Sequence, residues 1–301
     1  MSAHNPDTIV PVPRTFEQKL RDDMDKQQMS ALLRYLRQCT SELPYEKLEF
    51  KTKYGITDEQ WTEESELKAV MNNFSYVSDH CREFEDKKVF GRFLENVTKI
   101  HNHSEEFNDD YEQVLKILKD WQDAKKERQD DACEKHKKEF EDWYRDEINF
   151  IETSEKEVKD VFEQIEDFSN YTRDDWEYKV KPSVMRIEEK YQKSKKNFPD
   201  SLLQDVQKLG KSINDAMIVI GYVMKDLKTL TVYMEKLKNM FFKMSDDRGP
   251  ISIKKIYLED VKNKWPDLGK LASECHNKIF IIIEQQEKEE AAVYNAMLSD
   301  E

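Results

Sequence analysis

Glycine and proline are scarce in this sequence, with 6 and 8 copies in 301 residues. An all-β protein needs a turn signal about every ten residues, so this scarcity excludes a sandwich or a barrel. Glycine-rich phosphate-binding loops, nucleophile-elbow motifs and zinc-protease motifs are missing as well. Aromatic residues, which disordered chains lack, make up 11% of the sequence. The composition therefore predicts an ordered, all-α protein.

Cysteine is also rare, and long apolar runs do not occur. The four cysteines form no CxxC pair, which is typical of a reduced, cytosolic site of synthesis: Cys39, Cys81, Cys133 and Cys275. The most apolar runs, at 216–224 and 279–283, are shorter than the roughly 20 residues of a membrane-spanning helix. The first residues carry neither a basic region nor an apolar core, so we expect synthesis in the cytoplasm without a signal peptide.

Basic residues are outnumbered, 49 against 63 acidic ones, and the net charge is −14. Nucleic-acid binding requires basic patches that neutralise phosphates, so we expect no nucleic-acid partner. Constitutive docking on anionic lipid is disfavoured for the same reason.

No metal-binding or catalytic motif is complete in the sequence. Cys133 and His136 lie one helical turn apart, and His101 lies two residues before His103. A structural zinc site needs four ligands, and a diiron site needs Glu-x-x-His on two helices, so neither pattern is complete. We therefore expect a protein that is not an enzyme, with no catalytic, metal-binding or cofactor-binding residues and no small-molecule substrate.

The chain begins with a short leader and continues in long helices. Residues 1–13 contain three prolines and are expected to be extended, and Thr15 caps a first helix that ends near Leu43. Residues 57–60 (Thr-Asp-Glu-Gln) form a capping box that opens a second helix. No proline occurs between Pro44 and Pro182, so we expect one or two very long helices there.

Apolar residues repeat with heptad spacing in the middle of the chain. The first stretch of this repeat consists of Phe107, Tyr111, Val114, Leu118 and Trp121. The repeat lapses across the charged residues 123–138 and resumes at Phe140, while residues 170–175 (Asn-Tyr-Thr-Arg-Asp-Asp) are typical of a turn. We therefore predict that residues 121–198 form an extended helical hairpin, the head and neck of the molecule.

The last hundred residues have the most regular pattern. A helix that begins near Asp200 has an apolar stripe from position 202 to 244, and the stripe widens at 217–224, which we expect to be buried on all sides. Residues 246–250 interrupt it, and a last helix repeats the spacing from Leu258 to Ile282. The short break predicts antiparallel pairing. Residues 14–120 and 199–301 are then a tail bundle, so the predicted fold is an elongated bundle of long antiparallel coiled-coil helices.

Large apolar residues between positions 143 and 176 are interspersed with charge. They either fill the seams between helices, or they contact a membrane or a partner protein at one end of the rod. The residues that the second interpretation concerns are Trp143, Phe150, Ile151, Phe162, Phe168, Tyr171 and Trp176.

Residues 261–271 (Val-Lys-Asn-Lys-Trp-Pro-Asp-Leu-Gly-Lys-Leu), followed by Ala272 and Ile279, look like the tail helix of the cytolysin A-like α-helical pore-forming toxins. The chain length, the long helices and the tail bundle around a long hairpin resemble the same superfamily, especially the binary xenorhabdolysin subunits. The resemblance implies a soluble monomer that opens its hairpin and assembles into a membrane-piercing ring. Its implied partners are a second toxin subunit, further copies of itself, and a target-cell membrane that it reaches after release.

One departure from that family concerns the head. The family carries a clearly apolar hairpin there, whereas residues 120–198 are charged in this chain and give at best an amphipathic insert around Phe150, Phe162 and Phe168. This fits a subunit that needs a partner chain. The alternative is a cytosolic coiled-coil scaffold or adaptor without membrane activity, which should be a constitutive dimer indifferent to lipid. The wide stripe at 217–224 favours a self-contained bundle, and with it the toxin hypothesis.

Overall fold

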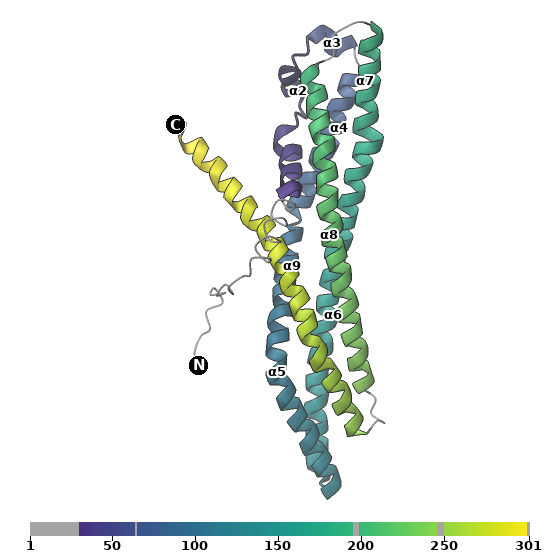
Figure 1. The fold of residues 1–301 in the computed structure, drawn as a ribbon, viewed down its shortest axis with the longest axis vertical. Helices are drawn as coiled ribbons and strands as arrows, with labels where there is room; N and C mark the ends of the chain where they lie inside the picture. Colours follow the sequence, from purple (N-terminus) through teal and green to yellow (C-terminus); the bar gives the residue numbers. More distant parts are fainter. Residues whose placement is uncertain (1–29, 64, 195–198, 246–249, 300–301) are drawn as a thin grey trace, which may run out of the picture.

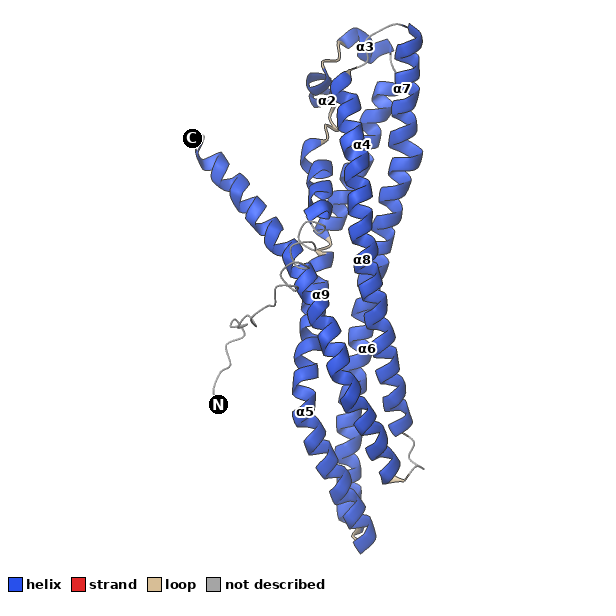
Figure 2. Cartoon of the chain, viewed as in Figure 1, coloured by secondary structure: helices blue, strands red, loops and turns tan. Residues whose placement is uncertain are grey.

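The computed structural model describes residues 30–63, 65–194, 199–245 and 250–299, so the expected leader at 1–13 and the Thr15 cap lie outside the described residues. Every regular element within those ranges is helical, and no strand occurs in them (Figure 2). This confirms the predicted all-α fold class.

The helices combine into a long rod (Figure 1). After a helix at 30–37, the elements are η1 (Gln38–Glu42), α2 (Lys47–Tyr54), α3 (Asp58–Glu63), α4 (Ser65–Asp86), α5 (Val89–Glu127), α6 (Asp130–Asp174), η2 (Asp175–Val180), α7 (Lys181–Ser194), α8 (Asp200–Met244) and α9 (Ile251–Ser299). The two η elements are π-helical. At about 1.5 Å per residue, the 45 residues of α8 span about 68 Å.

Different helices build the two halves of the rod. In the half with the α5–α6 turn, α9 packs against α5 and α8, and α6 packs against the same two helices. In the other half, α4 packs against η1, η2 and α7. The last turns of α9 extend away from the rod (Figure 1).

The predicted seams are largely confirmed. The heptad residues from Phe107 to Trp121 are all buried, as are the stripe positions of α8 from Leu202 to Met244 apart from the half-buried Met217 and Met224. Helices α8 and α9 are antiparallel, because Lys278 pairs with Asp226 at 2.7 Å far from the turn. Lys254 donates a hydrogen bond to the carbonyl of Met244 beside the turn.

Two details of the predicted pattern are wrong. Residues 217–224 are not buried on all sides, because Ile218 is 55% and Tyr222 46% exposed. Helix α8 has neighbours on only part of its circumference, so its outer face remains in solvent. The helix that was predicted to begin at the capping box is divided into α3, α4 and α5, and a left-handed Lys88 (φ 47°) separates α4 from α5. The one or two very long helices predicted between Pro44 and Pro182 are present as α5 and α6.

The reversal of the central hairpin also differs from the prediction. The backbone is helical through 170–175, where a turn was predicted, and continues through η2 into α7. Thr172 and Asp175 are buried on the inner side of this helix, so their polarity serves packing contacts rather than a turn. The chain reverses at Arg128, which is left-handed (φ 59°), inside the charged stretch where the heptads lapse. The division into a tail bundle and a hairpin at 121–198 stays a prediction.

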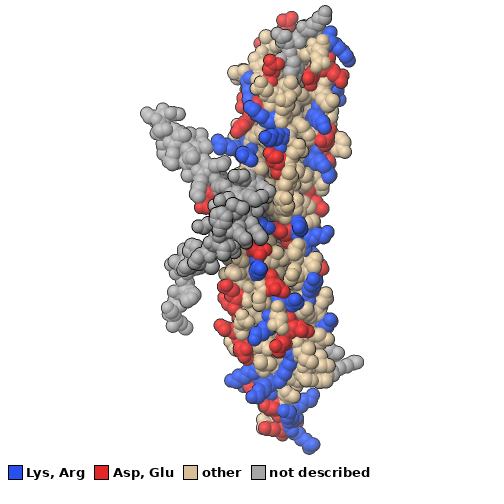
Figure 3. Space-filling model, viewed as in Figure 1, with Lys and Arg blue, Asp and Glu red and all other residues tan. Residues whose placement is uncertain are grey.

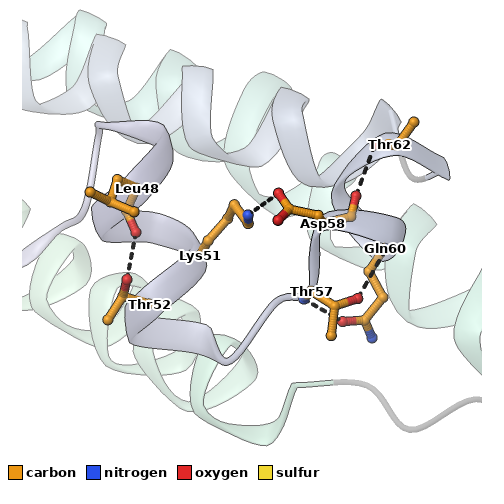
Figure 4. Close-up of polar contacts among 7 residues, drawn as sticks. All are labelled: Leu48, Lys51, Thr52, Thr57, Asp58, Gln60 and Thr62. Atoms are coloured by element: carbon orange, nitrogen blue, oxygen red, sulfur yellow. Dashed lines mark hydrogen bonds and ion pairs between the residues drawn. The ribbon is translucent and has the colours of Figure 1, made fainter.

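The capping box at the start of α3 is confirmed (Figure 4). The backbone N–H of Thr57 donates to Oε1 of Gln60 at 2.9 Å, and the N–H of Gln60 donates to Oγ1 of Thr57 at 3.2 Å. Helix α2 ends at a left-handed Gly55 (φ 62°), and Lys51 pairs with Asp58 across this corner.

Opposite charges alternate along the face of the rod in Figure 3. A buried ion pair joins α6 to α8, where the Glu155 carboxylate, 5% exposed, accepts hydrogen bonds from Lys159 of α6 and Lys238 of α8. Burial acts to raise the pKa of Glu155, but the two lysines outweigh it and hold that pKa below its usual value.

Candidate functional site

One layer of the rod combines irregular backbone with buried polar contacts. We call the layer formed by Tyr35, His80, Phe84, Phe168 and Asp175 the junction layer. It lies where both π-helical segments pack against α4. A π-helix is rare, and short π segments inside α-helices are frequent at functional sites. The layer is therefore the candidate functional site of the described chain.

The π segment η2 is held by side chains from α4. The Nδ2 of Asn73 donates to the carbonyl of Lys179 at 2.9 Å and lies 2.9 Å from Oγ of the buried Ser183. The wider turn changes the regular hydrogen-bond ladder, and the Asn73 amide supplies a donor to it. This contact fixes α4 against the point where α6 becomes α7.

Asp175 is a buried carboxylate, 2% exposed, at the first position of η2. Its Oδ2 lies 2.5 Å from Nδ1 of His80, and its Oδ1 accepts from Nζ of Lys179 at 2.6 Å. The ring of Tyr171 stacks on His80 with centroids 4.8 Å apart. A buried carboxylate is costly unless it is paired, so these contacts make the α4–η2 junction specific.

Aromatic rings make up the apolar part of the junction layer. Phe84 of α4 and Phe168 of α6 stack with centroids 4.0 Å apart, and Tyr35 lies 6.3 Å from Phe168. The hydroxyl of Tyr35 is 3.5 Å from Oγ1 of Thr172. Tyr35 thus brings the helix at 30–37 against α6 through apolar packing and this long hydrogen bond.

Buried thiols complete the contact between the first helix and α4. Cys39 and Cys81 are both 0% exposed, and Arg82 donates to the carbonyl of Thr40 at 3.2 Å. Burial, together with a hydrogen bond involving Cys81, raises the pKa of Cys39 well above its ordinary value. The thiol is therefore neutral at physiological pH, which suits packing rather than nucleophilic chemistry.

On the far side of η2, the Trp176 indole lies against Gly210 of α8. A Cβ atom at position 210 would be 2.5 Å from Cζ2 of Trp176, closer than atoms can pack. Glycine at this position lets α8 approach the π segment. The junction layer and the adjoining Trp176 thus connect the helix at 30–37, α4, α6 and α8 around the two π-helical segments.

No protein-family model matches this chain, and neither does any curated protein sequence. Among solved structures it is similar to the crystal structure of XaxA from Xenorhabdus nematophila. The match has a TM-score of 0.50 and covers 87% of this chain and 98% of that one, at 13% identity. This chain shares the XaxA fold. At this identity the likeness is distant and shows the fold alone.

The seven predicted contact residues follow α6 and η2 of the XaxA-like rod without forming one surface. Ile151 and Phe168 are buried, Tyr171 is 51% exposed, and the other four are half-buried: Trp143, Phe150, Phe162 and Trp176. Phe150 stacks on His103, with ring centroids 3.9 Å apart. The Nε2 atom of His103 lies 3.1 Å from the carboxylate of the buried Glu147. Their role as membrane or partner contacts stays a prediction.

Sequence reasoning did not find the residues that organise the junction layer. His80 and Asn73 carried no motif, and the polar run that contains Asp175 was interpreted as a turn. Of the predicted contact residues, Phe168 belongs to the layer, and Tyr171 and Trp176 lie beside it. The signal that identifies the layer is the pairing of residues about 95 to 137 positions apart, which the sequence does not contain.

Two kinds of feature are absent from the described residues. No group of three or more His, Cys, Asp or Glu side chains among them could hold a metal ion. No helix in the described ranges is long and apolar enough to cross a membrane.

Proposed function

We propose that this chain is a subunit of an α-helical pore-forming toxin, a monomer in water that assembles on a target membrane together with a second subunit. The observation that carries the proposal is the XaxA fold, which extends over 87% of this chain and 98% of XaxA. Release from the producing cell and action at a target-cell membrane belong to the same proposal.

Assembly requires the rod to open, because the apolar residues of α6 now face other helices. Ile151 and Phe168 are buried, and Phe150 and Phe162 are half-buried. Separation of α6 from its neighbours would present these residues as one amphipathic face to lipid or to the partner subunit. Since α6 itself is charged elsewhere, the partner would complete the membrane-inserted part.

The junction layer is where we propose that this opening begins. Its polar contacts are few and specific, and an interrupted helix ladder makes η2 the natural point of bending. Replacing Asp175 by Asn removes a charge that interacts with His80 and Lys179. Hydrogen bonds to charged groups contribute about 1.5–3 kcal/mol, so we expect a loss of stability of that order.

The test measures dye release from phosphatidylcholine vesicles and thermal unfolding in parallel. If contacts of the junction layer hold the rod closed, Asp175→Asn lowers the unfolding temperature and accelerates dye release or vesicle binding. Asp267→Asn is the control, because Asp267 forms a solvent-exposed pair with Lys264 at 3.4 Å. If Asp175→Asn destabilised the protein without changing vesicle binding or dye release, the proposal that opening begins at the junction layer would be refuted. Absence of lipid binding by every form, together with a stable dimer in solution, would favour the scaffold hypothesis instead.

A further inference from the structure

The outer face of α8 carries a second stripe of heptad spacing, on the side that points to solvent. Its positions repeat every four and three residues, and all but the half-buried Thr229 are exposed: Ile218, Tyr222, Lys225, Thr229, Val232 and Lys236. We call these six residues the α8 stripe. A heptad stripe on a helix is the pattern that packs against another helix. Since this stripe is basic and apolar, the helical face that fits it is acidic.

Helix α5 presents an acidic face on the other side of the same molecule. Because α6 and α9 each pack against both α5 and α8, helices α5 and α8 lie at opposite corners of the rod. Five of the eight residues from Glu105 to Glu112 are acidic, and none of the eight is Lys or Arg. The side chains of Glu95, Glu106 and Asp109 are exposed. Opposite faces with complementary charge suit a heterologous contact, which repeats from one copy of a chain to the next.

The contacts of α9 with both helices fix the heights of these two faces along the rod. Lys262 lies 3.6 Å from Glu112 of α5, and Lys278 lies 2.7 Å from Asp226 of α8. The two lysines are 16 residues apart, which is about 24 Å along α9. Because α8 is antiparallel to α9, the level of Glu112 corresponds to position 242 of α8, to within about one helical turn.

Counting back from this common level aligns lysines of α8 with glutamates of α5. The two helices run in the same direction, because their turns into α6 and α9 lie at the same end of the rod (Figure 1). Six residues before the common level lie Glu106 on α5 and Lys236 on α8. Seventeen residues before it lie Glu95 and Lys225. Two copies that stand side by side without a shift along the rod therefore bring both lysines of one copy level with both glutamates of the other.

We propose that copies of this chain assemble side by side, with the α8 stripe of one copy packed on the outer face of α5 of the next. Lys225 and Lys236 then pair with Glu95 and Glu106 of the neighbouring copy, and the exposed apolar residues of the stripe are covered. The inference rests on the proposed toxin function and names the surface through which copies assemble. Exposed ion pairs contribute little and association has an entropic cost, so the contact is weak in water and forms where a membrane concentrates the copies.

Charge reversal on one face at a time tests this contact. One variant combines Lys225→Glu with Lys236→Glu, and the other combines Glu95→Lys with Glu106→Lys. Light scattering measures the mass of each full-length protein after addition of mild detergent or phosphatidylcholine vesicles. We expect each variant alone to lose the large oligomer that the natural chain forms. An equimolar mixture of the two variants should recover it, because every contact in an alternating assembly then joins a lysine to a glutamate.

The control variant combines Lys156→Glu with Lys270→Glu, which changes the charge equally at exposed positions of α6 and α9 and should assemble like the natural chain. Two results would overturn the contact: assembly of both reversed variants alone, or a mixture that does not recover the oligomer. The second result includes the case in which no form assembles. Dye release from vesicles tests the toxin function separately, because release by the natural chain together with either of these results would overturn the contact only. Circular dichroism confirms that each variant is folded.

Discussion

Gly269 lies where α9 approaches α5 closely. A Cβ atom at this position would be 1.8 Å from Oγ and 2.6 Å from Cβ of Ser104. Ser104 is 7% exposed, and Nδ1 of His101 lies 3.3 Å from the carbonyl of Gly269. Gly269→Ala therefore cannot be accommodated unless the two helices move apart.

The size of the effect follows from two opposing contributions. Overpacking in a core costs about 1–3 kcal/mol, and contacts this short belong at the upper end. Alanine in place of glycine inside a helix stabilises the protein by about 1 kcal/mol. We expect a net loss of about 2 kcal/mol, or a fall of about 3 °C in unfolding temperature for a chain of this length, measured by calorimetry or circular dichroism.

The matched control is Gly221→Ala on α8, where an added Cβ would meet no atom within 4 Å. That change should stabilise the protein by about 1 kcal/mol. Combining Gly269→Ala with Ser104→Gly removes both clashing atoms, so the two changes should compensate each other by at least about 1 kcal/mol in a double-mutant cycle. If Gly269→Ala stabilised the protein as Gly221→Ala does, the close packing of α5 on α9 would be wrong.

Three further predictions concern local interactions. Thr57→Ala removes half of the capping box and should cost about 1 kcal/mol in urea unfolding, while an unchanged midpoint would contradict the cap. Glu155→Gln should destabilise the protein at pH 7. Because the pKa of Glu155 is lowered by folding, its contribution exists above the ordinary pKa of about 4.3 and disappears as the pH falls through the folded value, so melting curves of the two proteins should converge in acid. Burial raises the pKa of Cys275 to about 12, so iodoacetamide at pH 8 should modify the half-buried Cys133 well before Cys275. Mass spectrometry measures the labelling of each cysteine, and equal rates would refute this prediction.

The periodic parts of the fold could be predicted from the sequence. The stripe of α8 and the residues from Phe107 to Trp121 repeat every three or four positions, and burial follows that repeat wherever a helix has a partner on one side. The capping box was equally local, because its two hydrogen bonds join Thr57 and Gln60, which are three residues apart. Such features depend on neighbours in sequence.

The remainder depends on contacts between distant parts of the chain. The widened stripe around Ile218 suggested burial on all sides, but the number of neighbours of α8 is a property of the assembled rod. The polar run ending at Asp175 resembled a turn because its partner His80 lies 95 residues earlier. Likewise, nothing near Gly210 indicates that an indole from η2 rests against it. The junction layer was therefore beyond prediction from sequence patterns.

The most direct test of the proposed toxin role is size-exclusion chromatography with light scattering, in buffer and again after addition of phosphatidylcholine vesicles or mild detergent. The account predicts the mass of one chain in buffer and a much larger oligomer with lipid. A dimer that keeps the same mass in both conditions would contradict the toxin hypothesis and support a helical scaffold.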